Sequence, residues 1–240
     1  MRPRSLTILN AVAAVLCFAS FVAILATTTD IDHITFTRPS SSLDDPTPVS
    51  ITSANPGVLV ALFLLVSAVE HTAALLLPAY YDRSLATIST LRWISYAISA
   101  PIMTVIIYAS MLITDLWLNV LAAIICAVMI STGFFYELDR CIHYDKPRYH
   151  IPIFAVGFFL LSAIFVPIWY QYSCFNPPAL VHSIIATMTI CFWSFGFVPV
   201  LSLYFSEKAP FITSETAYIC LSITSKQLLA WLFAARYLTM

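Results

Sequence analysis

Charged residues are scarce in this sequence. Asp, Glu, Lys and Arg make up 10% of its 240 residues, whereas hydrophobic residues make up 60%. An ordinary soluble domain carries about 25% charged residues, so this composition excludes that class. Uncharged apolar runs of about 20 residues are instead long enough to cross a bilayer. The sequence therefore predicts an integral, multi-pass membrane protein.

The sequence also lacks the features of several other classes. Its net charge of -1 gives no excess of basic residues, which a nucleic-acid-binding face would require. It contains no N-x-S/T acceptor site and no metal-ligand spacing. We expect the six cysteines to be unpaired and to act mostly as small buried hydrophobes, because four lie in apolar runs and the other two on opposite sides of the membrane.

Charged and polar residues divide the chain into seven predicted helices that form one domain, residues 1–240. The expected ranges are about 5–29, 57–79, 85–114, 115–136, 150–171, 178–205 and 212–238. The first range is too long for the apolar region of a signal peptide, and no A-x-A site follows it. The long polar loop after it alternates Thr and Ser and could hold a short hairpin. The break "YQYSCFNPPA" divides an uncharged stretch, residues 149–206, into two helices.

The basic residues predict the orientation in the membrane. If the N-terminus is cytoplasmic, eight basic residues lie on the inner side and two on the outer side. The inner residues are Arg2, Arg4, Arg83, Arg92, Arg140, Lys146, Arg148 and Lys208, and the outer ones are Arg38 and Arg236. Because cytoplasmic loops are enriched in Lys and Arg, we expect a cytoplasmic N-terminus, an extracellular C-terminus and an extracellular first loop.

Two charged residues, Glu70 and Lys226, lie within the predicted spans and away from the helix ends. An ionisable side chain at the bilayer centre is costly unless an interaction compensates for it. One interpretation is a structural ion pair within the bundle. The other is that Lys226 is a covalent attachment point, since the amine of a lysine in a dry pocket condenses readily with an aldehyde to give a Schiff base.

Four segments resemble one known family. They are "YICLSITSKQLLAW" in the last predicted helix, "LRWISYAISA" in the third, "LVSAVEHTAALL" in the second and "LN" in the first. Matching positions along the rest of the chain include Gly133 with Glu137, Pro178 with Val181, and Phe192 with Phe195. On these residues the chain resembles the heliorhodopsins, which are retinal-binding photoreceptors.

The resemblance implies an all-α membrane protein with a seven-transmembrane-helix, rhodopsin-like bundle. It also implies all-trans-retinal bound as a protonated Schiff base to Lys226, with Phe192 and Phe195 in the pocket. Photoisomerisation would then drive a conformational signal, without enzymatic activity, in a homodimer that acts on an unknown partner. Heliorhodopsins have the N-terminus inside, which agrees with the orientation that the basic residues predict.

Two positions depart from the family pattern. Ser95 stands where heliorhodopsins carry a glutamate counterion, and Cys17 stands where they carry a histidine. A buried protonated Schiff base without an anion should lose its proton. Either Glu70 or chloride replaces the missing anion, or the pigment absorbs in the ultraviolet. Glu70 and Ser95 both lie about 14 Å from the inner helix ends, so Glu70 is at a suitable depth, although it could also be a neutral, protonated residue that faces another helix.

Other polar residues near this level are weaker candidates. His71 could take part in internal proton transfer or only form an interhelical hydrogen bond. Ser222 lies one turn before Lys226 and could, with Ser95, hydrogen-bond near the Schiff base or only pack. We expect His182 to be an interfacial polar residue. The aromatic residues Trp169, Phe192, Trp193, Phe195 and Phe197 could line a polyene slot or form plain core.

Three functional classes stay open at this point. The first is a light sensor that signals through a change of shape, and the second is light-driven or light-gated ion transport, above all of protons. The third is a seven-helix scaffold that binds no retinal.

Overall fold

A computed structural model of the chain describes residues 4–28, 33–40, 47–86, 88–142, 150–175, 177–205 and 210–238. Its helices are α1 (Arg4–Thr27), α2 (Pro56–Leu76), α3 (Pro78–Ala86), α4 (Thr90–Ser110), α5 (Leu116–Ile142), α6 (His150–Cys174), α7 (Ala179–Phe205) and α8 (Pro210–Leu238). Seven helices in the described residues, all except α3, are long and apolar enough to cross a membrane. The expected seven-helix bundle is therefore confirmed.

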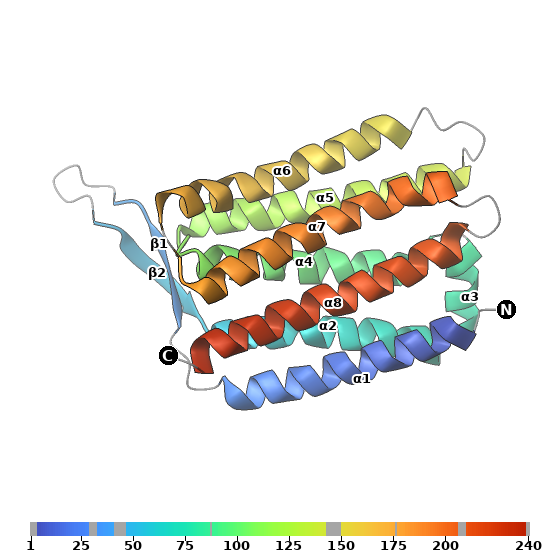
Figure 1. Ribbon diagram of the computed structural model, residues 1–240, viewed down its shortest axis with the longest axis horizontal. Coiled ribbons are helices and arrows are strands. Elements are labelled where there is room, and N and C mark those ends of the chain that lie inside the picture. The colour runs from blue at the N-terminus through green and yellow to red at the C-terminus, as the bar shows by residue number, and fades with distance from the viewer. Residues whose placement is uncertain are drawn as a thin grey trace.

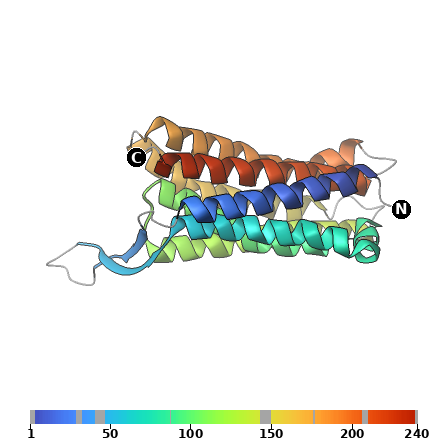
Figure 2. The same ribbon diagram turned by 90° about the horizontal axis from the view of Figure 1, so that it is seen from below.

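The seven long helices lie side by side and form a closed bundle (Figure 1). Successive helices pack as neighbours, and α1 packs on α8 to complete the ring. The N-terminus and the C-terminus lie at opposite ends of the bundle, which we call the N-terminal end and the C-terminal end (Figures 1 and 2). The main core of buried apolar residues runs through the middle of the bundle and includes Phe63, Ile106, Ile164, Met188 and Phe233.

The loop after α1 contains a hairpin, as its Thr and Ser alternation suggested. Strand β1 (Ile34–Arg38) pairs antiparallel with β2 (Val49–Ala54), and the register shifts between Phe36 and Thr37. The hairpin extends from the C-terminal end of the bundle (Figure 1). The Thr37 backbone N–H donates to the Thr114 carbonyl at 3.0 Å, which ties the hairpin to the connection between α4 and α5.

Several helix ends differ from the sequence-based ranges. The expected second helix, 57–79, ends earlier because Pro78 cannot continue the hydrogen-bond ladder and instead begins the short helix α3. The expected third helix, 85–114, is wrong at both ends, since α4 covers only Thr90–Ser110. A turn follows it, with Leu112 at a φ of 59°. The expected fourth helix, 115–136, continues to Ile142, because Glu137 and Arg140 are buried within the bundle.

All six cysteines are free. Cys17, Cys126 and Cys191 are buried, whereas Cys141, Cys174 and Cys220 are exposed on the surface of the bundle. The expectation of unpaired cysteines is confirmed.

Candidate functional site

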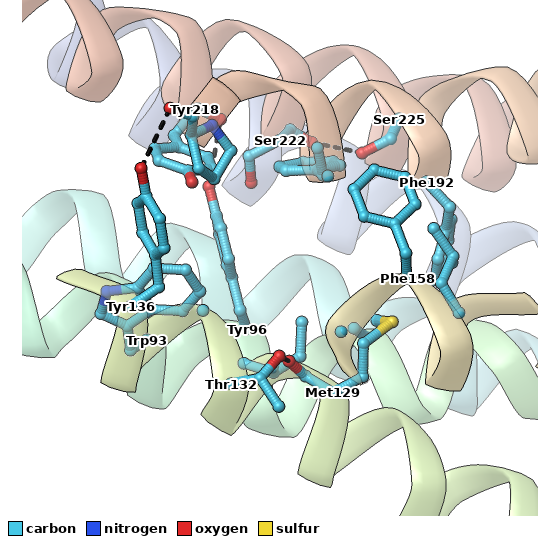
Figure 3. A pocket seen from close by; sticks show the side chains of 18 of the residues that line it. Trp93, Tyr96, Met129, Thr132, Tyr136, Phe158, Phe192, Tyr218, Ser222 and Ser225 are labelled. Carbon is cyan, nitrogen blue, oxygen red and sulfur yellow. Dashed lines mark hydrogen bonds between the residues drawn. The ribbon is translucent and has the colours of Figure 1, made fainter. Parts of the chain in front are cut away.

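An elongated cavity lies inside the bundle between α4, α5, α6, α7 and α8. Its volume is about 880 Å³, including space open to the surface, and its walls are mostly apolar and aromatic. In Figure 3, Trp93, Tyr136 and Tyr218 lie at one end, Phe158 and Phe192 lie at the other, and Tyr96 lies between them. The cavity has the apolar and aromatic walls of a site for a small hydrophobic ligand.

Lys226 contributes to the wall of this cavity from α8. Its side chain is 3% exposed, and its Nζ donates to the Ser222 hydroxyl at 3.0 Å. Nζ also lies 5.1 Å from the centre of the Tyr96 ring. Lys226 forms no ion pair with a described residue, so the structural ion pair with Glu70, one of the two interpretations of the sequence, is not present as a direct contact.

Aromatic residues fix the shape of the cavity. The rings of Trp93, Tyr96, Phe195 and Tyr218 pack against one another, mostly edge to face, with centroids 5.6–6.4 Å apart. The Tyr96 hydroxyl donates to the Tyr218 carbonyl at 3.0 Å, so this ring is also held by a hydrogen bond. Edge-to-face packing of this kind gives a rigid wall.

Glycines create the space between the helices. Gly133, Gly157 and Gly196, three of the four glycines in the sequence, line the cavity. A Cβ atom at Gly133 would lie 2.4 Å from the Trp93 ring, and one at Gly196 would lie 2.9 Å from the Phe158 ring. Both contacts are too short for carbon atoms, so the aromatic rings occupy space that only glycine leaves free.

The structure brings together some of the residues that the sequence suggested. Phe192, Phe195, Ser222 and Lys226 line the cavity. Trp193 is partly buried against the main core, and neither it nor Trp169 or Phe197 is among the cavity-lining residues. His182 accepts or donates a hydrogen bond with the Tyr172 hydroxyl at 2.6 Å, between α6 and α7, and is likewise separate from the cavity.

Glu70 and His71 on α2 and Ser95 on α4 are not among the residues that line the cavity. Ser95 is buried but does not line the cavity, whereas Ser99, one turn later, does. Glu70 is half-buried, and its Oε2 atom is shielded without a hydrogen bond to described residues. Electrostatic interactions nevertheless connect the Glu70 carboxylate with Lys226 and His71.

Several further buried polar atoms in this region have no hydrogen-bond partner among the described residues. They are Ser67 Oγ, His71 Nε2, Ser95 Oγ and Ser99 Oγ. Such atoms are rare in folded proteins and usually contact water or an ion. The buried parts of α2 and α4 therefore retain hydrogen-bonding capacity.

Sequence reasoning missed a buried ionic cluster at the N-terminal end of the bundle. Arg92 on α4 forms ion pairs with Glu137 on α5 and with Glu215 on α8. The guanidinium also lies 4.4 Å from the centre of the Tyr218 ring, and Trp93 Nε1 donates to Glu137 Oε2 at 2.6 Å. We call Arg92, Glu137 and Glu215 the Arg92 cluster. In the sequence these three residues lie near the ends of apolar runs, where charged residues are ordinary. The sequence pattern therefore gave no indication that they form a buried cluster.

Sequence reasoning also missed Tyr96, Ser99, Tyr218 and Ser225, which line the cavity. A signal for two of them was present, because Tyr218, Ser222, Ser225 and Lys226 follow the spacing of one helix face.

The whole chain matches one protein family. The heliorhodopsin family profile matches residues 6–238. The chain belongs to the heliorhodopsin family. Heliorhodopsins are retinal proteins of the photoreceptor type, so the family implies a retinal chromophore in an integral membrane protein.

Solved structures of microbial rhodopsins share the fold of this heliorhodopsin. A light-driven proton pump from Leptosphaeria maculans has a TM-score of 0.72 at 11% identity, over 100% of this chain and 96% of its own. Exiguobacterium sibiricum rhodopsin has a TM-score of 0.68 at 13% identity, and the match covers 98% of this chain and 99% of that rhodopsin. The transmembrane domain of Salpingoeca rosetta rhodopsin phosphodiesterase has a TM-score of 0.70 at 11% identity, and the match covers 98% of this chain and 85% of that domain's chain. No curated protein sequence matches the chain.

The residues present fit a retinal molecule. The cavity is long, apolar and walled by aromatic rings, and a buried lysine amine forms part of its wall. A covalently bound polyene aldehyde requires both features: apolar space for the chain and a primary amine for the aldehyde.

Proposed function

We propose that this heliorhodopsin is a light sensor in which Lys226 is the covalent attachment point of all-trans-retinal. The observation that carries the proposal is the buried Nζ of Lys226 in the cavity wall, with Ser222 as its hydrogen-bond partner. A desolvated lysine amine joins an aldehyde carbon with loss of water. When bound, retinal supplies the absorption of light and the isomerisation that follows it.

The protein supplies a dry and rigid enclosure. Phe192 and Phe195 exclude water from the space beside Lys226, and Tyr96 is held in place by its hydrogen bond to α8. Because the rings pack against one another, a change of ligand shape is transmitted to the helices instead of being absorbed by loose side chains.

Glu70 is our candidate for the anion that balances a positive charge at Nζ of Lys226. Ser95 carries no charge, and the carboxylates of Glu137 and Glu215 are engaged by Arg92. Glu70 keeps an oxygen without a hydrogen bond to described residues and interacts electrostatically with Lys226. A chloride ion held by the unpaired hydroxyls of Ser95 and Ser99 is the second candidate.

The proposal assigns sensing and not ion pumping. A pump requires an acceptor and a donor on opposite sides of the reacting nitrogen, and Glu70 is the one carboxylate of the described membrane helices that interacts with Lys226. We also propose a cytoplasmic N-terminus, from the distribution of basic residues, and, from the family resemblance, a homodimer that acts on an unidentified signalling partner.

Reconstitution with all-trans-retinal tests the proposal. The wild-type chain should give an absorption band distinct from that of free retinal, resistant to mild hydroxylamine in the dark, and the band should change reversibly on illumination. Lys226→Ala should lose the band, whereas the control Ser222→Ala, which keeps the amine, should retain it. A hydroxylamine-resistant band in Lys226→Ala would refute the attachment.

A further inference from the structure

Two groups lie next to the amine nitrogen of Lys226. Its Nζ donates to the Ser222 hydroxyl at 3.0 Å, and the centre of the Tyr96 ring lies 5.1 Å from Nζ. The Ser222 hydroxyl is neutral, and Lys226 forms no ion pair with a described residue. Within the described part of the chain, a positive charge at Nζ therefore has no carboxylate in direct contact.

An aromatic ring attracts positive charge. The face of the ring is electron-rich, and a cation within about 6 Å of the ring centre is stabilised, most strongly where water is excluded. Tyr96 is 5% exposed and Lys226 is 3% exposed, so both groups lie in such a dry site. The attraction acts on the charge and requires no N–H, so it persists for as long as the nitrogen is charged, however many hydrogens it carries.

Tyr96 is held in place at its hydroxyl and at its ring. The hydroxyl donates to the Tyr218 carbonyl at 3.0 Å. The rings of Trp93, Phe195 and Tyr218 pack against the Tyr96 ring at interplanar angles of 66–81°. In Figure 3 the Tyr96 side chain extends towards Ser222. The ring therefore cannot turn away from Nζ without breaking these contacts.

The spacing of residues along α8 explains how one side chain reaches both contacts. Tyr218, Ser222 and Lys226 follow one another at intervals of about one helical turn, so they share a face of the helix. A long side chain on a helix points back towards the N-terminus, which brings Nζ of Lys226 to the level of Ser222. Tyr96 approaches this face from α4, with its hydroxyl at Tyr218 and its ring beside Nζ.

We infer that the Tyr96 ring is a binding site for positive charge at Nζ of Lys226, and that it supports this charge beside the uncharged Ser95. The inference rests on the proposed function only for the use of the charge, which would set the pH range of the visible band in the retinal-loaded protein. A carboxylate beside Nζ could accept its proton, whereas an aromatic ring cannot. The ring therefore stabilises the charge without offering the proton a new place.

Fluorinated side chains at position 96 test the inference in the retinal-free protein. Fluorine withdraws electrons from a ring and weakens its attraction for a cation, with little change in shape. The variants are Tyr96→Phe, Tyr96→4-fluorophenylalanine and Tyr96→3,4,5-trifluorophenylalanine. The chain has three lysines, so ¹⁵N-lysine NMR gives few Nζ signals, and that of Lys226 is assigned from its loss in Lys226→Ala. Titration of this signal gives the pH midpoint at which Nζ loses its charge.

We expect the pH midpoint to fall in the order of increasing fluorination, by about one unit over the series. Tyr96→Phe keeps the ring and should lie close to the wild type. The matched control is Phe165→3,4,5-trifluorophenylalanine, in a buried ring that does not line the cavity, and it should leave the midpoint unchanged. Equal midpoints across the Tyr96 series would overturn the inference. A fall in Tyr96→Phe as large as in the trifluorinated variant would also overturn it, because the hydroxyl and not the ring would then be responsible.

Other titratable groups on the neighbouring helices are the same in all these variants. Those with an electrostatic interaction with Lys226 are Cys17 on α1 and Glu70 and His71 on α2, and Tyr136 and Tyr218 line the cavity. Their influence is common to the whole series, so differences between the variants report the ring. A role of Tyr96 in packing alone would give no graded change, because the side chains of the series have similar shapes.

Titration of the retinal-loaded protein separates this inference from the proposed function. Where the visible band forms, its pH midpoint should fall in the same order. A graded midpoint in the retinal-free series, in a protein that forms no band with retinal, would support the inference and refute the proposed function. A visible band together with an ungraded retinal-free series would support the proposed function and overturn the inference.

Discussion

At the scale of single residues, the question is which group balances a charge on Lys226. Three glutamates of the described helices differ in their surroundings: Glu137 and Glu215 are paired with Arg92, whereas Glu70 has an oxygen without a hydrogen bond to described residues. An anion in a low-dielectric site stabilises a nearby positive charge by several kcal/mol, so a free carboxylate at this position has a large effect.

Replacement of Glu70 tests this assignment. In Glu70→Gln we expect the retinal absorption band to move from the visible to the near-ultraviolet at pH 7, or to depend on added chloride, because loss of the anion disfavours a positive charge at Nζ. The pH midpoint of the visible band should fall. Titration of the absorbance from about pH 4 to 10, in chloride and in sulfate, measures both effects.

A second substitution serves as the matched rescue. Ser95→Glu places a carboxylate at the position where other heliorhodopsins are expected to carry the glutamate counterion. It should therefore restore the visible band in the Glu70→Gln background. An unchanged pH midpoint in Glu70→Gln alone would remove Glu70 from this role and favour a bound chloride.

The sequence identified Lys226 and Glu70 because a charge in the middle of an apolar run is conspicuous. It did not identify the Arg92 cluster, since Arg92, Glu137 and Glu215 lie close to the ends of the apolar runs, where charged residues are ordinary. Arg92 lies within two residues of the start of α4, yet it is 2% exposed because α5 and α8 extend past it. Whether a residue near a helix end is buried depends on how far the neighbouring helices extend. The hydropathy of one helix gives no information about this.

At the scale of helices, the contact between α4 and α5 depends on a glycine. A Cβ atom at Gly133 would meet the Trp93 ring, and that ring cannot easily move because its Nε1 is bonded to Glu137 at 2.6 Å. We therefore expect Gly133→Ala to destabilise the protein by about 1–3 kcal/mol and to reduce retinal binding. Ser131→Ala on the exposed face of the same helix is the control and should change stability by less than about 0.5 kcal/mol. Equal thermal unfolding midpoints for the two variants would show that the contact is not tight.

The Arg92 cluster connects α4, α5 and α8. Arg92→Gln leaves two buried carboxylates without their shared partner, so we expect a loss of about 3–5 kcal/mol. Addition of Glu215→Gln should recover part of this loss, because it removes one of the unpaired charges. Arg38→Gln, on the exposed hairpin strand, is the control and should leave the thermal unfolding midpoint unchanged. If the double variant is less stable than Arg92→Gln, repulsion between the carboxylates is not the cause.

Helix number was predictable because each span is an apolar run bounded by polar or proline residues. The separate helix α3 was not, since residues 78–86 carry too little apolar character to distinguish a short helix from the start of the next span. Pro78 was the available signal, because proline is favoured at the first position of a helix.

At the scale of the whole molecule, we expect a light sensor with a cytoplasmic N-terminus. Illuminated whole-cell recordings should show no stationary proton current, since Glu70 is the one carboxylate of the described membrane helices with an electrostatic interaction with Lys226, and a pump requires both an acceptor and a donor. Stationary photocurrents that reverse with the proton gradient would instead indicate a light-gated channel. A fluorescent or protease-sensitive tag at the N-terminus, accessible only after permeabilisation, would support the expected orientation.

The central claim is the bond between retinal and Lys226, and peptide mapping tests it most directly. The chain has only three lysines, Lys146, Lys208 and Lys226, so an adduct can be located without ambiguity. Borohydride reduction of the retinal-loaded protein, followed by digestion and mass spectrometry, should place the retinyl mass on the peptide that contains Lys226. A retinyl adduct on Lys146 or Lys208, or none in a sample that shows the visible band, would contradict the account.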